Sequence, residues 1–174
     1  MRYWLPVVAF FVLLLLLMFG LNSDRDKNAL PSPFIGKQAP DFELPYVLDP
    51  QQVLTPASYA GKAVLINVWA TWCVGCRQEH DFLLALAESN TIPIYGINWR
   101  DNREEAVRWL ERLGNPYIAS GFDGSGRVGI NWGVYGAPET FLIGRDGTVL
   151  HKHLGPLSPA TWERDFVPLL RGGG

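Results

Sequence analysis

The sequence predicts an α/β domain with a central mixed β-sheet flanked by helices, preceded by an N-terminal transmembrane helix. Three observations lead to this fold. Apolar runs typical of strands alternate with helical patterns over residues 63–119, which indicates β–α–β units. An Asp146-Gly147 pair then separates two strand-like runs, which predicts an antiparallel hairpin, and a helical pattern follows it. The first 21 residues are strongly apolar and form a separate segment.

This N-terminal segment has the length of a membrane span. Residues 3–21 contain no charged side chain and are dominated by Leu, Val and Phe. As a helix they extend over about 28 Å, close to the thickness of a bilayer core. A cleaved signal peptide is the alternative, but its apolar core is usually shorter, and the sequence around Leu21 is a poor cleavage site. We therefore expect an uncleaved anchor over residues 1–21, with Arg2 on the cytoplasmic side.

The rest of the chain divides into a linker and one domain. Residues 22–36 are polar, include Pro31 and Pro33, and show no apolar period, so a linker is expected there. The domain is expected over residues 37–171, which is long enough for one good core. The formal net charge of the chain is −2, which argues against a nucleic-acid partner, because such proteins carry a basic face.

Hydrophobic periodicity and capping residues define the elements of the domain in order. Continuous apolar runs predict buried strands, whereas Phe42 and Leu44, which alternate with charged residues, predict a short strand. Asn102 and Ser158 are N-cap residues at the starts of two amphipathic patterns. Strands are expected at 42–44, 53–54, 63–69, 92–98, 117–119, 140–143 and 148–153, and helices at 74–88, 102–113 and 159–170, with a helix or turn at 124–130.

The only two cysteines, Cys73 and Cys76, lie between the strand at 63–69 and the helix at 74–88. The sulfur of Cys73 then faces the unpaired N–H groups of the first helical turn, whose partial positive charge favours the thiolate. A thiolate is the form that attacks disulfides. Cys76, one turn further on, can close a short disulfide with Cys73. The pattern predicts a redox-active pair in which Cys73 is the exposed attacking thiol and Cys76 is shielded.

The two cysteines also have two alternative interpretations. They could be buried structural residues, or they could form part of a metal site. A structural zinc site usually needs four ligands, and the chain has no second Cys pair and no His pair at finger spacing. His80 follows Cys76 by four residues on the same helical face, so a three-ligand copper site of a metallochaperone stays open as an alternative. The favoured interpretation is a redox pair that needs no metal and no cofactor.

A second motif precedes the expected strand at 140–143. Here Pro138 follows a Gly-x-x-Gly-Ala sequence that starts at Gly133. A proline directly before a strand is compatible with a cis X-Pro turn. The motif gains weight because it occurs in the same chain as the strand–Cys-x-x-Cys–helix pattern.

The segments Val68–Cys76 and Gly136–Thr140 together resemble those of thioredoxin-fold proteins. More narrowly, the chain resembles the membrane-anchored, periplasmic DsbE/CcmG-type thiol:disulfide interchange proteins of cytochrome c biogenesis. The resemblance covers about residues 36–170 and includes the N-terminal anchor. One departure is the Val74-Gly75 pair between the cysteines, where Pro-Thr is commoner.

The resemblance implies a role for each site residue. Cys73 would be the nucleophile and Cys76 the resolving thiol, joined in a redox-active disulfide. Pro138 would be a cis proline beside them, with the backbone of Ala137 offered to an extended substrate strand. Trp72, Glu79 and Glu139 would contact substrate or tune the cysteines. Thioredoxins carry a buried aspartate where this chain has Asn67, so Glu79 or Glu139 would replace it as proton acceptor for Cys76.

The resemblance also implies a function. Such a protein would reduce the disulfide of the Cys-x-x-Cys-His segment of apocytochrome c, or of a maturation factor that carries it, before haem attachment. A transmembrane thiol reductase would supply the electrons. The protein would be a single-pass protein of a bacterial inner membrane with its catalytic domain in the periplasm. A general periplasmic thiol reductase is the alternative within the same enzyme class.

Overall fold

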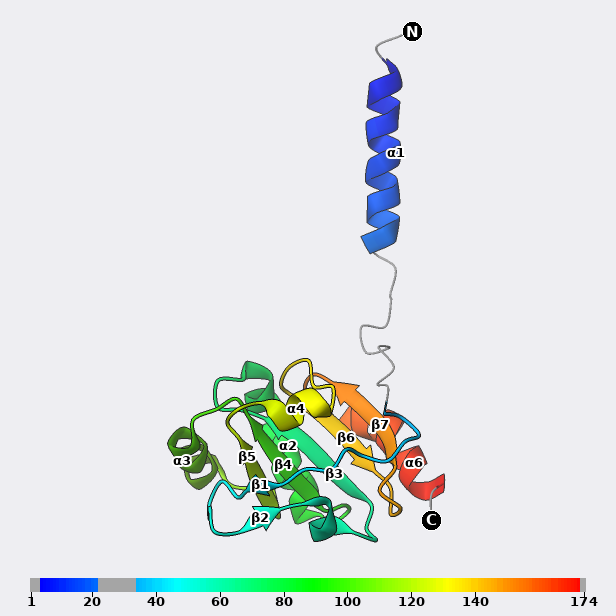
Figure 1. The fold of residues 1–174 in the computed structure, drawn as a ribbon. Coiled ribbons are helices and arrows are strands. Elements are labelled where there is room, and N and C mark those ends of the chain that lie inside the picture. Colours follow the sequence, from blue (N-terminus) through cyan, green and yellow to red (C-terminus); the bar gives the residue numbers. More distant parts are fainter. Residues whose placement is uncertain (1–3, 22–33, 173–174) are drawn as a thin grey trace. The chain divides into compact units, whose positions relative to one another are not determined.

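The computed structural model describes residues 4–21 and 34–172 (Figure 1). The chain divides into two compact units, residues 1–31 and 32–174. In the first unit, helix α1 spans Trp4–Leu21. Among the described residues, no helix combines the length and the apolar character that a membrane span needs, so the expected transmembrane helix is not shown. Most of the expected linker, residues 22–33, lies outside the described residues.

The second unit is built on a mixed five-stranded sheet with the strand order β5-β4-β3-β6-β7 (Figure 1). Strands β3, β4 and β5 run parallel to one another, whereas β6 pairs antiparallel with both β3 and β7. The expected mixed sheet is confirmed. The strands are β3 (Val64–Trp69), β4 (Ile94–Trp99), β5 (Ala119–Asp123), β6 (Glu139–Ile143) and β7 (Val149–Leu154), and a separate small hairpin pairs β1 (Leu44–Pro45) with β2 (Val53–Leu54).

One face of the sheet is covered by helices. The chain crosses from β3 to β4 through α2 (Val74–Glu88) and from β4 to β5 through α3 (Arg103–Leu113). Both steps go in the same direction along the sheet, and right-handed crossovers therefore place both helices on one face. Their buried side chains share a core with Trp162 and Phe166 from the C-terminal helices. Those helices are α5 (Pro159–Thr161), the π-helical turn η2 (Trp162–Phe166) and α6 (Val167–Gly172).

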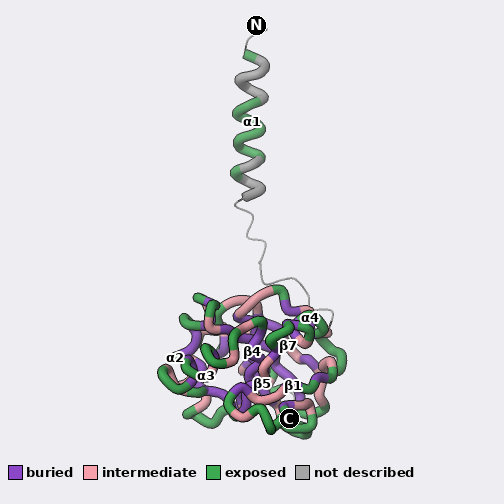
Figure 2. The backbone as a smooth tube through the Cα atoms, turned by 60° about the vertical axis from the view of Figure 1, so that its left-hand side comes forward, coloured by how far each residue is buried: buried purple, intermediate pink, exposed green. Residues whose placement is uncertain are grey.

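The other face of the sheet has a different cover. Its core contains Leu44 and Leu54 from the small hairpin, Tyr59 from the short helix η1 (Pro56–Tyr59), and Trp132, which follows α4 (Arg127–Asn131). The sheet between the two cores is almost entirely buried (Figure 2). This explains why β3 and β4 read as continuous apolar runs rather than as alternating patterns.

Two elements differ from the sequence expectation. The strand expected at 117–119 is β5, which begins at Ala119 and continues to Asp123. Its Ser-Gly sequence lacks a strand signal, but Gly121 lies directly under Leu44, where a β-carbon would meet that side chain at 2.7 Å. The expected C-terminal helix contains the π-helical turn η2 in its middle. By contrast, α2 begins and ends where the sequence predicted.

Candidate active site

The two cysteines lie at the point where the chain leaves β3 and enters α2. They form a disulfide with an S–S distance of 2.15 Å. Cys73 is the N-cap residue of α2, and its Sγ accepts a hydrogen bond of 3.0 Å from the backbone N–H of Cys76. β3 ends at Trp69, four residues before Cys73, and α2 begins directly after Cys73 and carries Cys76, so the strand-to-helix turn alone brings the pair together. The N–H groups of this helix terminus would stabilise a thiolate at Cys73 in the reduced protein.

Both cysteines are nearly buried in this disulfide-bonded state. Cys73 is 4% exposed and Cys76 is 3% exposed. The exposure expected for Cys73 is therefore absent in the disulfide-bonded state. The difference in accessibility expected for the reduced protein stays a prediction.

Pro138 packs against the turn between the cysteines. The Ala137–Pro138 peptide bond is cis, as the sequence motif predicted. A β-carbon added to Gly75 would lie 2.8 Å from Pro138 Cδ and 3.1 Å from Pro156 Cγ. The carbonyl of Pro138 also accepts a hydrogen bond of 2.9 Å from the backbone N–H of Gly155. The structure thus brings Pro138 to the cysteine pair, and it adds the segment around Pro156, which the sequence did not reveal.

Glu79 is buried one helical turn after Cys76, with 1% of its surface exposed. One carboxylate oxygen, Oε1, accepts a hydrogen bond of 2.8 Å from Nδ2 of Asn67 on β3. The other, Oε2, accepts one of 2.6 Å from the backbone N–H of Leu157. The sequence pattern implied a tuning role for Glu79 but did not show that it is buried. Its burial depends on the loop after β7, which sequence periodicity does not locate.

Burial raises the pKa of Glu79 to about 7, because desolvation penalises the ionised carboxylate. The hydrogen bonds from Leu157 and Asn67 act in the opposite direction and lower the pKa. Glu79 can therefore both accept and release a proton near neutral pH. Such a group is suited to proton exchange with a thiol on the same helix.

Glu139 lies on the other face of the sheet from Glu79. It shares its face with Val68, its partner on β3, whose side chain belongs to the core that contains Trp132. Its Oε2 forms a buried ion pair with Lys152 Nζ at 2.9 Å. Its Oε1 accepts hydrogen bonds from the backbone N–H groups of Tyr135 and Gly136. Glu139 thus holds the loop that leads to Pro138, and the two glutamates do not converge on the cysteines.

The surface around the disulfide is apolar and exposed. Trp72 is 52% exposed, Val74 is 75% exposed and Tyr135 is 66% exposed. Trp72 is anchored, since its Nε1 donates a hydrogen bond of 3.0 Å to the carbonyl of Arg100. The preceding residue, Thr71, donates both its backbone N–H and its hydroxyl to the Asp101 carboxylate at 2.6 Å each. Asp101 carries no signal in the sequence, because its role in holding Thr71 depends on a contact between two segments that are distant in the chain.

His80 does not face an open metal site. Its Nε2 lies 3.2 Å from the carbonyl of Gly114, and its ring packs edge-on against Trp109. Burial lowers the pKa of His80. Within residues 4–21 and 34–172, no group of three or more His, Cys, Asp or Glu side chains could hold a metal ion. A metal site formed by Cys73, Cys76 and His80 thus has no support from the geometry.

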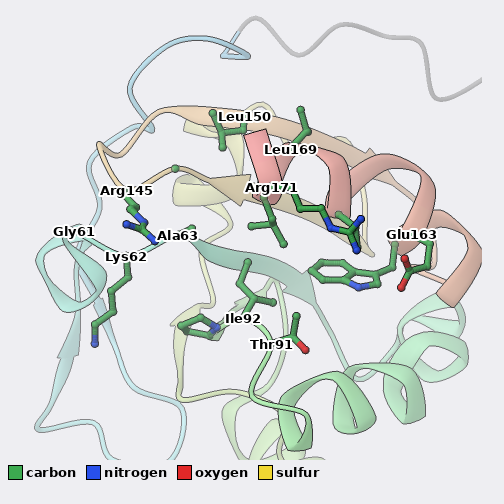
Figure 3. Close-up of a pocket in the computed structure, with 15 residues that line it drawn as sticks. Gly61, Lys62, Ala63, Thr91, Ile92, Arg145, Leu150, Glu163, Leu169 and Arg171 are labelled. Carbon is green, nitrogen blue, oxygen red and sulfur yellow. The ribbon is translucent and has the colours of Figure 1, made fainter. Parts of the chain in front are cut away.

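A cavity of about 630 Å³ lies at the opposite end of the sheet (Figure 3). It is lined by Ala63, which precedes β3, by Ile92, which precedes β4, and by residues of α6 such as Leu169. Since Cys73 follows the other end of β3, this cavity is separate from the cysteine pair. The candidate site is therefore the disulfide and the exposed apolar surface around it.

Comparison with known proteins supports a redox role for the cysteine pair. Residues 34–166 match the Redoxin family. The chain is 45% identical to the thiol:disulfide interchange protein DsbE of Pseudomonas aeruginosa, over 95% of this chain and 90% of that protein. It is 43% identical to DsbE of Allochromatium vinosum, over 97% and 92% of the two chains. A crystal structure of a DsbE-type protein from Chlorobium tepidum matches with a TM-score of 0.66 and 29% identity, over 80% of this chain and 98% of that one.

The sequence matches cover nearly all of both chains, and the structural match extends the likeness to the fold. The central mixed sheet with its flanking helices is thus a thioredoxin-like fold, as the two motifs suggested. The Cys73–Cys76 disulfide lies within the matched residues. The chain belongs to the Redoxin family and, within it, to the DsbE group of thiol:disulfide interchange proteins, and it is a disulfide oxidoreductase.

Proposed function

We propose that the protein reduces the Cys-x-x-Cys-His disulfide of apocytochrome c, or of a maturation factor that carries it, before haem is attached. The observation that carries this proposal is a single Cys-x-x-Cys disulfide at a helix N-terminus, packed beside Pro138, in a chain of the DsbE group. The substrate is proposed from the sequence resemblance to proteins of cytochrome c biogenesis. The exchange itself needs no cofactor.

In the proposed reaction, the reduced protein donates two electrons to the substrate disulfide. The Cys73 thiolate attacks one substrate sulfur, which breaks the substrate S–S bond and forms a mixed disulfide. Cys76 then loses its proton, and its thiolate attacks Cys73 Sγ. This step releases the substrate as a dithiol and leaves the Cys73–Cys76 disulfide. Glu79 is the proposed proton acceptor for Cys76, since it lies one turn away and has a pKa of about 7.

The apolar surface is the proposed substrate site. Trp72, Val74 and Tyr135 are exposed although they are large and apolar, and exposed apolar clusters of this kind often bind partners. The pairing of β6 with β3 begins at Glu139, so the backbone of Ala137 is not used by the sheet. An extended substrate strand would pair with Ala137 and place its disulfide beside Cys73.

Residues 1–21 are proposed as an anchor in the bacterial inner membrane, residues 22–36 as a linker and residues 37–171 as the periplasmic catalytic domain. The charge-free sequence of residues 3–21 supports this assignment. A lone dithiol in an oxidising compartment is driven to the disulfide unless it is continuously reduced. The proposed electron donor is therefore a transmembrane thiol reductase, and membrane attachment would raise its effective concentration.

Trapping the mixed disulfide tests the proposal. A Cys76→Ser variant produced in its native host cannot complete the second step, so it should accumulate a disulfide between Cys73 and apocytochrome c or its maturation factor. A Cys73→Ser/Cys76→Ser variant is the matched control and should trap nothing. Deletion should abolish c-type cytochromes, and added small thiols should restore them. Membrane fractionation of the full chain checks the anchor.

Three results would overturn parts of the proposal. Trapping of many unrelated secreted proteins would indicate a general periplasmic thiol reductase. Normal cytochrome c levels in a clean deletion would remove the proposed substrate. Copper that co-purifies at one ion per chain would indicate a metallochaperone that uses Cys73, Cys76 and His80.

A further inference from the structure

We infer that Tyr117 is a positioning residue for Glu79, because its hydroxyl orients the Asn67 amide so that an N–H group faces the Glu79 carboxylate. The three side chains come from distant parts of the chain: Tyr117 precedes β5, Asn67 lies on β3 and Glu79 lies on α2. The functional consequence for catalysis rests on the proposed role of Glu79 as proton acceptor. The orienting role itself depends only on the buried contacts.

Both N–H donors and the oxygen of the Asn67 amide have hydrogen-bond partners. Its Nδ2 donates to Glu79 Oε1 at 2.8 Å and to Thr140 Oγ1 at 3.1 Å. Its Oδ1 accepts from the Tyr117 hydroxyl at 2.8 Å. An amide nitrogen has two donors, so both are used, and the oxygen has a donor of its own. Asn67 is fully buried, with 0% exposure, so water cannot replace these partners.

The orientation of this amide matters because an ionised carboxylate can only accept hydrogen bonds. If the amide of Asn67 rotated by half a turn, its Oδ1 would face Glu79 Oε1, and two acceptor oxygens would be in contact. That arrangement requires a protonated Glu79. The Tyr117 hydroxyl opposes the rotation, since in the observed orientation it donates to Oδ1. Tyr117 thereby favours the ionised form of Glu79 without touching it.

The ring of Tyr117 is held independently of its hydroxyl. The ring stacks on Trp69 with 5.5 Å between centroids, and the backbone N–H donates to the Asn115 side chain at 3.0 Å. Tyr117→Phe therefore removes the hydroxyl and keeps the packing. Tyr59 provides a matched control, because its buried hydroxyl has no hydrogen-bond partner among the described residues. Tyr59→Phe removes a hydroxyl of similar burial that does not contact Asn67.

The test is a carbon-13 NMR titration of the Glu79 carboxyl in the oxidised protein, in which the cysteines do not titrate. In Tyr117→Phe we expect the pKa of Glu79 to rise by about one pH unit, because a donor to the carboxylate is no longer fixed. Tyr59→Phe should leave it unchanged. In an Asn67→Leu background, Tyr117→Phe should add no further rise, since Tyr117 acts through Asn67. An unchanged pKa in Tyr117→Phe, or an equal effect with and without Asn67, would overturn the inference.

A second measurement separates this inference from the proposed function. The pH profile of the step in which Cys76 releases the substrate is measured on the same variants. If the pKa of Glu79 rises in Tyr117→Phe but the profile stays in place, Tyr117 orients the carboxylate and Glu79 is not the proton acceptor. If both move together, the inference and the role of Glu79 hold. If the profile moves while the pKa of Glu79 does not, Tyr117 acts by another route and the inference fails.

Discussion

Gly75 lies against Pro138 so closely that a β-carbon at position 75 would stand 2.8 Å from Pro138 Cδ and 3.1 Å from Pro156 Cγ. The atoms it would meet belong to proline rings, which cannot move without the backbone. This contact is a physical reason for glycine at position 75. The Val-Gly pair between the cysteines thereby departs from the commoner Pro-Thr. A threonine at position 75 would require both prolines to shift away from the turn.

Gly75→Ala is expected to destabilise the oxidised protein, although alanine is normally the better helix residue. Overpacking costs about 1–3 kcal/mol, and the gain in helix propensity offsets at most about 1 kcal/mol. We expect a net loss of about 1 kcal/mol in the free energy of unfolding, measured by denaturant titration. Val74→Ala is the control, because Val74 is 75% exposed and should change stability little. Equal stability of Gly75→Ala and the natural protein would show that Pro138 and Pro156 can shift away from position 75 without a cost in free energy.

Alkylation of the reduced protein should modify Cys73 before Cys76. Cys73 caps α2, and the N–H of Cys76 points to its sulfur at 3.0 Å. This contact favours the Cys73 thiolate, which is the reactive form. Mass spectrometry after brief treatment with a bulky maleimide reports which residue is labelled first. Preferential labelling of Cys76 would reverse the roles proposed for the two thiols.

The sequence predicted the features that depend on local pattern. The strand before Cys73, the bounds of α2 and the cis bond at Pro138 all follow from periodicity or a short motif. The surroundings of the two glutamates could not be predicted in this way. Glu79 is buried by the loop at Leu157, and Glu139 is paired with Lys152 from the next strand. Both environments depend on the tertiary packing of segments whose own sequences carry no signal for the contact.

The contribution of Glu79 to the stability of the oxidised protein should fall as pH rises through neutrality. Its pKa is raised from 4.5 to about 7 by burial, so the folded protein binds this proton more tightly than the unfolded chain does. The contribution is fully present below pH 4.5 and is lost as pH rises through about 7. At higher pH the loss approaches about 3 kcal/mol.

Glu79→Gln isolates this effect, because the variant retains the other titrating groups. His80, His151 and His153 have pKa values lowered by burial, so they change stability in the opposite direction as they titrate. The quantity to measure is the difference in unfolding free energy between the natural protein and Glu79→Gln at pH 5 and pH 8. A difference that is independent of pH would mean that the carboxyl of Glu79 is not perturbed in the folded state.

The buried ion pair between Lys152 and Glu139 is expected to be costly to break from one side only. Both side chains are almost fully buried, and Lys152 also donates to the carbonyl of Gly133 at 2.7 Å. Lys152→Met leaves the Glu139 carboxylate without its counter-ion, which typically costs about 3–5 kcal/mol. Since Glu139 also binds the N–H groups of Tyr135 and Gly136, the loop before Pro138 should loosen, and disulfide exchange should slow.

A double variant distinguishes an unpaired charge from lost packing. In Lys152→Met/Glu139→Gln no charge remains to be buried, so much of the stability lost in Lys152→Met should return, as measured by denaturant titration. Arg108→Ala is the control, because it breaks the exposed pair with Glu105 and should cost less than about 1 kcal/mol. The alternative outcome is a double variant no more stable than Lys152→Met alone. It would show that the charge of Glu139 matters little and that the lysine acts through its packing over Tyr135 and its hydrogen bond to Gly133.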